Sequence, residues 1–348
     1  MIPENEVIPL KKWFAAVLLA ALVLTGCGPK QPEAHEAQLF AMDTLMSLRI
    51  WGEEALVTQT EDTLRSLEAL LSATAEDSDI ARLNRDGTAE LQPQTADLLQ
   101  QALDCATRTG GAFDPTVYPL VCLWGFPSGK YHVPTEAELT GALAHTGAQH
   151  LQLDGAAAAL DAGCSVDLGG IAKGYAGDAV RTVLAEFGVT SAVIDLGGDV
   201  GLLGAKPDGS DWRVAVKDPA DPSEFLGVLT AADTFVVTSG IYERGFEENG
   251  VRYHHIIDPK TGKPAESGLV SVTVVCGDGA WADALSTACF VLGEAGSLAL
   301  RDTLAAEKNL RIELILVTDD GHVRYTAGLA ERFEPSEEGT YVYEAIIA

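Results

Sequence analysis

The sequence has 348 residues, of which 47% are hydrophobic and 21% are charged. This composition predicts a folded globular chain, because disordered chains lack the apolar surface that offsets the entropy of ordering. Acidic residues number 51 against 23 Lys and Arg, and the resulting net charge of −28 disfavours nucleic acid as a partner. A phosphate-bearing ligand would therefore need a metal ion, backbone N–H groups or a well-placed lysine.

The first predicted element is an export signal. Lys11 and Lys12 precede an apolar run of 12 residues from Trp13 to Leu24. This run is shorter than the roughly 20 residues that span a bilayer, and its flanks are typical of a signal peptide. The tetrapeptide Leu-Thr-Gly-Cys that ends at Cys27 resembles a bacterial lipobox, in which the cysteine is acylated and becomes the mature N-terminus. The alternative is an ordinary signal peptide beside a chance cysteine.

The five cysteines that follow are widely spaced and form no Cys-x-x-Cys pair. Export would permit disulfides, but the odd number and the apolar neighbours of several of these residues favour free cysteines packed as small hydrophobic side chains. A zinc site made of cysteine ligands is not predicted. The five residues are Cys105, Cys122, Cys164, Cys276 and Cys289.

Hydrophobic periodicity predicts the elements of the remaining chain. The predicted strands and hairpins are 40–50, 151–160 (turning at 154–155), 191–196, 212–216, 227–229, 234–238, 253–257, 269–275 and 311–318. The predicted helices are 53–71, 95–108, 136–145, 171–187, 280–290 and 294–305. Because strands and helices do not alternate strictly, the pattern predicts an α+β chain rather than a doubly wound parallel sheet.

Three glycine-rich or acidic turns are candidates for function. Asp114-Pro115 predicts a turn that holds Phe113 and Asp114 either in a site or at a rigid corner. In Asp-Leu-Gly-Gly-Ile-Ala-Lys-Gly-Tyr, two glycines lead into a helix with Lys173 in its first turn. Such a helix start suits a phosphate, although a tight strand-to-helix turn explains it equally well, and neither the Walker A nor the Gly-x-Gly-x-x-Gly pattern is present. The third turn, 195–199 (Asp-Leu-Gly-Gly-Asp), is predicted to be structural.

The longest candidate segment runs from residue 238 to residue 287. Asp283 and Thr287 are four positions apart on a predicted helix, so both oxygens lie on one face. This pair could bind Mg²⁺, or it could belong to an ordinary polar helix face. His254 and His255 are adjacent on a predicted strand and point to opposite faces, so only one of them can serve a given site. A single histidine of this kind is either catalytic or structural.

Taken together, these segments resemble the ApbE-type FAD:protein FMN transferases, which attach FMN covalently to other proteins. The resemblance rests on the FDPTV, DLGGIAKGY, TSGIYER, HHIIDPKTGKP and DALST segments and covers essentially the whole chain from about residue 40. It implies an α+β fold with mixed or antiparallel sheets and packed helices. The expected regions are a lipoprotein signal peptide at 1–26, a lipid anchor and tether at 27–38, and a flavin transferase domain at 39–348. The expected location is the cell membrane, on its extracytoplasmic side.

The resemblance also implies a role for each matched position. Asp283, Thr287 and the carbonyl of Gly170 would bind Mg²⁺, and His255 would be the catalytic base. The residues that would contact FAD are Met42, Ala112, Phe113, Asp114, Asp167, Lys173 and Ile257. The sequence departs from the family in two places: Met-Asp-Thr replaces the usual Met-Gly-Thr at residues 42–44, and the segment before residue 78 lacks the aromatic residue that covers the flavin in many relatives.

The implied reaction is Mg²⁺-dependent transfer of FMN from FAD to a Thr or Ser hydroxyl of an acceptor protein, with release of AMP. The base would accept the proton of that hydroxyl. The expected acceptors are exported flavin-carrying subunits of membrane redox complexes, of the Rnf or sodium-pumping NADH:quinone reductase type. Two alternatives stay open: an Mg²⁺-dependent FAD pyrophosphatase that yields FMN and AMP, and a flavin-binding lipoprotein without catalysis.

Overall fold

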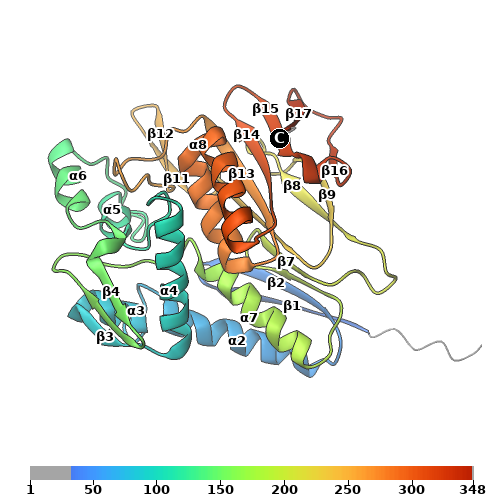
Figure 1. Cartoon of the computed structure of the whole chain (residues 1–348), viewed down its shortest axis with the longest axis horizontal. Helices are drawn as coiled ribbons and strands as arrows, with labels where there is room; N and C mark the ends of the chain where they lie inside the picture. The colour runs from blue at the N-terminus through green and yellow to red at the C-terminus, as the bar shows by residue number, and fades with distance from the viewer. Residues whose placement is uncertain (1–32, 347–348) are drawn as a thin grey trace, which may run out of the picture. The chain divides into compact units, whose positions relative to one another are not determined.

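A large mixed sheet organises the chain (Figure 1). The computed structural model describes residues 33–346, and within them this sheet has nine strands in the order β1-β2-β6-β7-β10-β13-β14-β15-β17. Neighbouring strands are antiparallel except β15 and β17, which are parallel. The strands are β1 (Ala34–Ala41), β2 (Thr44–Trp51), β6 (Ala192–Asp195), β7 (Asp199–Leu203), β10 (Phe235–Gly240), β13 (Leu269–Cys276), β14 (Ile312–Thr318), β15 (His322–Thr326) and β17 (Val342–Ile346).

Helices cover one face of this sheet. Figure 1 shows α2, α7 and α8 lying in front of the strands, and α8 contacts both β10 and β13. Although α8 is long and apolar enough to cross a membrane by length and composition, it is packed as a core helix. The α-helices of the described chain are α2 (Ala55–Leu71), α3 (Asp79–Asp86), α4 (Pro93–Arg108), α5 (Tyr118–Leu123), α6 (Glu136–Leu143), α7 (Ala172–Glu186) and α8 (Gly279–Lys308). Two 3₁₀ turns are η1 (Ala148–His150) and η2 (Ala327–Leu329).

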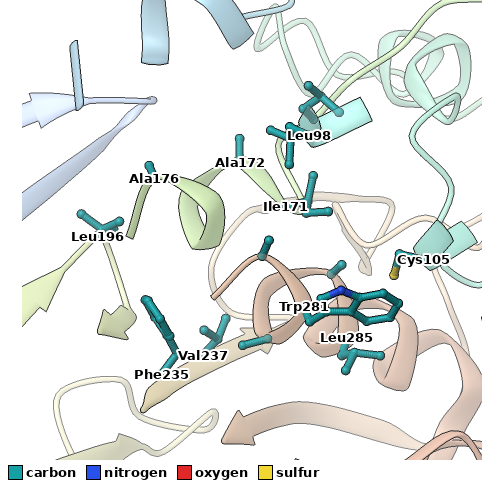
Figure 2. Close-up of a cluster of buried hydrophobic side chains, with 14 of the residues drawn as sticks. Leu98, Cys105, Ile171, Ala172, Ala176, Leu196, Phe235, Val237, Trp281 and Leu285 are labelled. Carbon is teal, nitrogen blue, oxygen red and sulfur yellow. The ribbon is translucent and has the colours of Figure 1, made fainter. Parts of the chain in front are cut away.

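The main hydrophobic core lies between the helices and the sheet. Figure 2 shows Phe235 and Val237 of β10 beside Trp281 and Leu285 of α8, with Ile171 and Ala172 at the start of α7 nearby. Neighbouring strand residues point to opposite faces, so Val236 belongs to a second core on the other side of the sheet. Burial of these apolar side chains fixes where α7 and α8 begin. Candidate site residues lie near the start of both helices, Lys173 in α7 and Asp283 in α8.

A three-stranded sheet packs over the second core. Its order is β16-β9-β8, and Trp212 and Leu229 pack against Val236 and Ile315 of the large sheet. Its strands are β8 (Trp212–Lys217), β9 (Phe225–Ala231) and β16 (Phe333–Pro335). The remaining small sheets consist of β3 (Thr88–Glu90), β4 (Leu151–Asp154) and β5 (Ala157–Leu160), and of β11 (Gly245–Glu248) with β12 (Val251–His254).

The structure confirms the α+β class and corrects the predicted elements in three places. Residues 40–50 were expected to form one strand, but the chain reverses at Met42 and Asp43, both of which have positive φ angles, and forms the β1–β2 hairpin. The helices expected at 280–290 and 294–305 are one element, α8, with non-helical backbone at Gly293. Residues 253–257 were expected as a strand, but β12 ends at residue 254 and Ile257 forms only an isolated bridge with Pro264.

The five cysteines that follow the signal segment are all free, as predicted, and four of them are buried, as expected of small hydrophobic side chains. Cys122 is exposed instead, because it lies on the solvent side of the short helix α5. The signal peptide, the anchor and all but the last six residues of the tether (27–38), including Cys27, lie outside the described residues.

Candidate active site

A cavity of about 1160 Å³ collects the predicted site residues. Every position predicted to bind flavin or metal, or to act as base, lines this one cavity, although the residues come from segments far apart in the sequence. They are Met42, Ala112, Phe113, Asp114, Asp167, Gly170, Lys173, His255, Ile257, Asp283 and Thr287. Perturbed titratable groups gather in the same space, which is the usual mark of a functional site.

The beginnings of α7 and α8 touch at the floor of the cavity. A Cβ atom placed on Gly174 would lie 1.9 Å from the carbonyl oxygen of Gly279, so only glycine permits this approach. The approach lets the backbone N–H of Gly174 donate to Oδ2 of Asp283 at 3.0 Å. The Asp283 carboxylate is thereby fixed at the junction, with only 3% of the residue exposed.

Lys173 is surrounded by carboxylates. Its ammonium lies 2.7 Å from Oδ2 of Asp199 and 3.4 Å from Oδ1 of Asp283. Burial alone would lower the pKa of Lys173, but the two carboxylates outweigh burial and hold that pKa above its ordinary value. Lys173 therefore stays charged.

The same cluster holds more negative charge than one lysine can balance. Burial, with further repulsion from Asp283, raises the pKa of Glu243 to about 7. The pKa of Asp199 is raised in the same way, mainly by burial, despite its ion pair with Lys173. A cation at this point would relieve both groups, because an added positive charge favours ionised carboxylates.

A threonine hydroxyl and a glycine backbone lie near the Asp283 carboxylate. Thr287 lies one helical turn after Asp283, and its hydroxyl has no hydrogen-bond partner within residues 33–346. Gly170 is adjacent, since a Cβ placed on it would lie 3.6 Å from Oγ1 of Thr287. No cluster of three or more His, Cys, Asp or Glu side chains arranged to hold a metal occurs in the described chain. The Asp283 carboxylate and the free Thr287 hydroxyl, with the Gly170 backbone adjacent, suit Mg²⁺, an ion that takes oxygen ligands and keeps several waters.

The two adjacent histidines have separate surroundings, as strand alternation predicts. Nε2 of His254 lies 3.2 Å from the carbonyl of Ala265, and its ring packs edge-on against Phe290. His255 lines the cavity, and its Nδ1 lies 3.2 Å from the carbonyl oxygen of Arg244. Burial lowers the pKa of His255 to about 4, outweighing the hydrogen bond to Arg244. The imidazole is therefore neutral near pH 7.

The predicted flavin-contacting residues line the same cavity, and Phe113 is close to the Thr287 side, since a Cβ placed on Gly170 would lie 3.4 Å from the Phe113 ring. The backbone N–H of Phe113 donates to Oγ1 of Thr109 at 3.2 Å. The Asp114 carboxylate accepts hydrogen bonds from Thr116 and from the N–H of Ala148. Asp114 therefore holds its own loop as a rigid corner while lining the cavity, so both interpretations of this turn apply.

Met42 and Asp167 are anchored in comparable ways. The N–H of Met42 donates to Oε1 of Glu68 at 2.7 Å, which ties the β1–β2 turn to α2. Asp167 accepts from the N–H of Gly169 at 3.1 Å, and burial raises its pKa. These hydrogen bonds anchor the backbone of two segments that line the cavity.

Comparison with known proteins identifies the family of the chain. A sequence model described as the ApbE family matches residues 42–310. The chain belongs to the ApbE family. A protein from Vibrio cholerae named FAD:protein FMN transferase is 33% identical over 337 residues, covering 93% of this chain and 99% of the relative. One of the same name from Treponema pallidum is 34% identical, covering 92% of this chain and 95% of the relative.

Solved structures of ApbE proteins share the fold. The crystal structure of the ApbE protein from Thermotoga maritima superposes with a TM-score of 0.76 at 33% identity and covers 88% of this chain and 97% of that one. The flavin transferase ApbE from Vibrio cholerae superposes with a TM-score of 0.75 at 31% identity, covering 86% of this chain and all of that one.

Sequence reasoning missed two carboxylates of this ApbE site. Asp199 ends the Asp-Leu-Gly-Gly-Asp turn that was predicted to be structural, yet it forms the shortest contact of Lys173. Glu243 lies within the TSGIYER segment, to which no role was assigned, and it lines the cavity. The available signal was the scarcity of lysine: a buried cation in so acidic a chain requires nearby carboxylates.

Proposed function

We propose that this ApbE-family chain is an Mg²⁺-dependent FAD:protein FMN transferase. The observation that carries the proposal is the neutral imidazole of His255 in the same cavity as the fixed Asp283 carboxylate and the unpaired Thr287 hydroxyl. A binding module would need neither a free base nor a cation site. The names of its relatives from Vibrio cholerae and Treponema pallidum support the same activity.

His255 is the proposed general base. Its Nδ1–H donates to the Arg244 carbonyl, so Nε2 carries the lone pair and has no hydrogen-bond partner in the described chain. Nε2 takes the proton from an acceptor Thr or Ser hydroxyl while that oxygen attacks the FMN phosphorus of FAD. The bond from that phosphorus to the AMP oxygen breaks, so AMP leaves and a phosphoester-linked FMN remains on the acceptor.

Asp283, Thr287 and the Gly170 carbonyl would hold Mg²⁺. When bound, the ion supplies charge neutralisation at the pyrophosphate. Lys173 adds a fixed positive charge beside it, held in place by Asp199. The residues that would contact FAD come from several segments, among them the Asp114 turn and the Asp167 turn. They are Met42, Ala112, Phe113, Asp114, Asp167, Lys173 and Ile257.

The proposed location is the extracytoplasmic face of the cell membrane, through acylation of Cys27. The basis is the Leu-Thr-Gly-Cys tetrapeptide after a short apolar run. An anchored enzyme would meet exported flavin-accepting subunits of membrane redox complexes, such as those of the Rnf or sodium-pumping NADH:quinone reductase type. We propose these subunits as the acceptors.

Intact-mass measurement tests the proposed activity. The purified enzyme is incubated with FAD, Mg²⁺ and an Rnf-type acceptor subunit, and the acceptor is then weighed. A gain equal to one FMN, together with free AMP, is the expected result. Free FMN and AMP without an adduct would instead identify an FAD pyrophosphatase, and unchanged FAD would leave only a flavin-binding protein.

A further inference from the structure

The strand β8 has a free edge at the cavity. Within residues 33–346, β8 pairs only with β9, and its other edge has no partner strand. The four consecutive residues 214–217 all line the cavity that contains His255 and Asp283. Neighbouring strand residues point to opposite faces, so an unbroken run of lining residues means that the edge of the strand, and not one face, borders the cavity.

The hydrogen bonds of β9 show which backbone groups of β8 point outward. On its far side β9 bonds to β16 through Thr230 N–H to the Arg332 carbonyl and through the Leu226 carbonyl to Ser336 N–H. Even-numbered residues of β9 therefore face β16, and odd-numbered residues face β8. In the β8–β9 register, Leu229 is opposite Val214 and Gly227 is opposite Val216.

Val214 and Val216 consequently bond to β9, and Ala215 between them directs its N–H and C=O toward the free edge. Within the described chain, no hydrogen bond outside the β8–β9 ladder reaches either group of Ala215. The Ala215 side chain is small and exposed, so nothing from the residue itself blocks the edge. Unpaired backbone groups along a strand edge are a template for another extended chain.

The size of the cavity agrees with a second occupant. At about 1160 Å³ it exceeds the roughly 300–1,000 Å³ typical of small-molecule sites. The residues proposed to contact FAD come from the β1–β2 turn, the loops that precede α5 and α7, the first turn of α7 and the segment after β12, and none comes from β8. The acceptor hydroxyl, in contrast, must enter the cavity on a polypeptide.

We propose that the acceptor protein docks by adding an extended segment to the free edge of β8, with backbone hydrogen bonds to Ala215. This inference rests on the proposed function, because it names how the acceptor of that reaction is held. Strand addition obtains its affinity from main-chain hydrogen bonds. It would place the hydroxyl-bearing residue inside the cavity that His255 lines.

A proline substitution tests the docking mode. Ala215→Pro removes the outward N–H and places a ring on the free edge, while proline is tolerated where an edge N–H has no partner. We expect the KM for an Rnf-type acceptor subunit to rise about tenfold or more, with FAD affinity and melting temperature retained. Ala215→Ser keeps the N–H at the same position and is the matched comparison, with a much smaller rise in the acceptor KM expected than for Ala215→Pro.

Two outcomes would overturn the docking mode: an unchanged acceptor KM in Ala215→Pro, or a loss of FAD affinity that equals the loss of transfer. The latter would place FAD, not the acceptor, at this edge. If wild type itself forms no FMN adduct on the acceptor, the proposed function fails instead, so the two failures are distinguishable.

Hydrogen exchange gives a second test that does not depend on folding of the proline variant. The wild-type enzyme is mixed with an acceptor subunit whose flavin-accepting Thr or Ser is replaced by Ala, so that the complex does not turn over. The amide of Ala215 should exchange quickly in the free enzyme and become protected in the complex. Equal exchange with and without a saturating acceptor would contradict strand addition.

Discussion

The carbonyl oxygen of Arg244 accepts hydrogen bonds from both the backbone N–H and the Nδ1 of His255, each at 3.2 Å. A carbonyl can only accept, so Nδ1 carries the proton and Nε2 keeps its lone pair. Arg244 ends the TSGIYER segment, and His255 follows the β11–β12 hairpin. The hairpin therefore brings the histidine back to the residue that sets its tautomer.

The pH dependence of transfer should reflect the low pKa of His255. Burial lowers this pKa to about 4, so the imidazole remains able to accept a proton throughout the neutral range. We expect the single-turnover rate of FMN transfer, at saturating FAD and Mg²⁺, to show no histidine titration near the ordinary pKa of about 6.5. An inflection at that pH that disappears in His255→Asn would contradict the low pKa of His255.

The same shift predicts a loss of stability in acid. Between the ordinary histidine pKa of about 6.5 and the native pKa of about 4, the unfolded chain binds a proton that the native His255 excludes. Stability therefore rises with pH across this window and is lost as the pH falls through it. Urea unfolding of wild type and His255→Asn at both ends of the window should show a shallower slope for the variant.

Thr287→Val should raise the Mg²⁺ requirement without harming the fold. The Thr287 hydroxyl has no hydrogen-bond partner in the described chain, so its removal leaves the melting temperature within about 2 °C of wild type. Loss of a metal-facing oxygen should raise the Mg²⁺ concentration for half-maximal transfer by about tenfold. Thr303→Val, on the exposed side of the same helix, is the control. An unchanged Mg²⁺ dependence would remove Thr287 from the proposed metal site.

Asp199→Asn should affect the cation site through Lys173. The ammonium loses its close carboxylate and is left with Asp283 at 3.4 Å, where it competes with Mg²⁺. We expect a higher Mg²⁺ requirement and a stability loss of about 1–3 kcal/mol, because the pair is largely buried. Metal titration combined with urea unfolding measures both. A stability loss with an unchanged Mg²⁺ requirement would limit Asp199 to a structural role.

The sequence was most informative where the local spacing of residues alone determines where their side chains lie. Alternation along the predicted strand separated His254 from His255, although β12 itself ends at His254, and helical spacing was enough to place Asp283 and Thr287 one turn apart. Periodicity also located α2 and the β4–β5 hairpin to within two residues at each end. These features depend on local geometry alone.

Features that depend on tertiary contacts were not accessible in the same way. The turn at Met42 and Asp43 carries no glycine, so its positive φ angles gave no signal of a hairpin. Asp199 appeared to be a turn residue because its partner, Lys173, is 26 positions away. The free edge of β8 follows from strand order, which no periodicity encodes.

Cys27→Ser should release the enzyme from the membrane fraction and leave catalysis intact. Acyl chains on Cys27 would provide the anchor, whereas the catalytic residues lie in the folded body. Fractionation of cells expressing each form, followed by assay of the soluble fraction, measures both effects. A variant that still sediments with membranes would show that another segment holds the protein there.

His255→Ala should separate FAD binding from FMN transfer. The imidazole is proposed to take a proton from the acceptor and not to hold FAD, so flavin affinity should change little. Removal of a general base costs about 10²–10⁴-fold in rate, or about 3–5 kcal/mol of barrier.

His254→Ala is the matched control: that ring packs against Phe290 and bonds to the Ala265 carbonyl, so its loss should lower stability and leave the rate near wild type. Flavin fluorescence titration and single-turnover mass measurement on both variants decide between the roles. Equal rate losses in the two variants, each matching a loss of stability, would reduce His255 to a structural residue and direct the search for the base toward Glu243, the nearby carboxylate whose pKa is about 7.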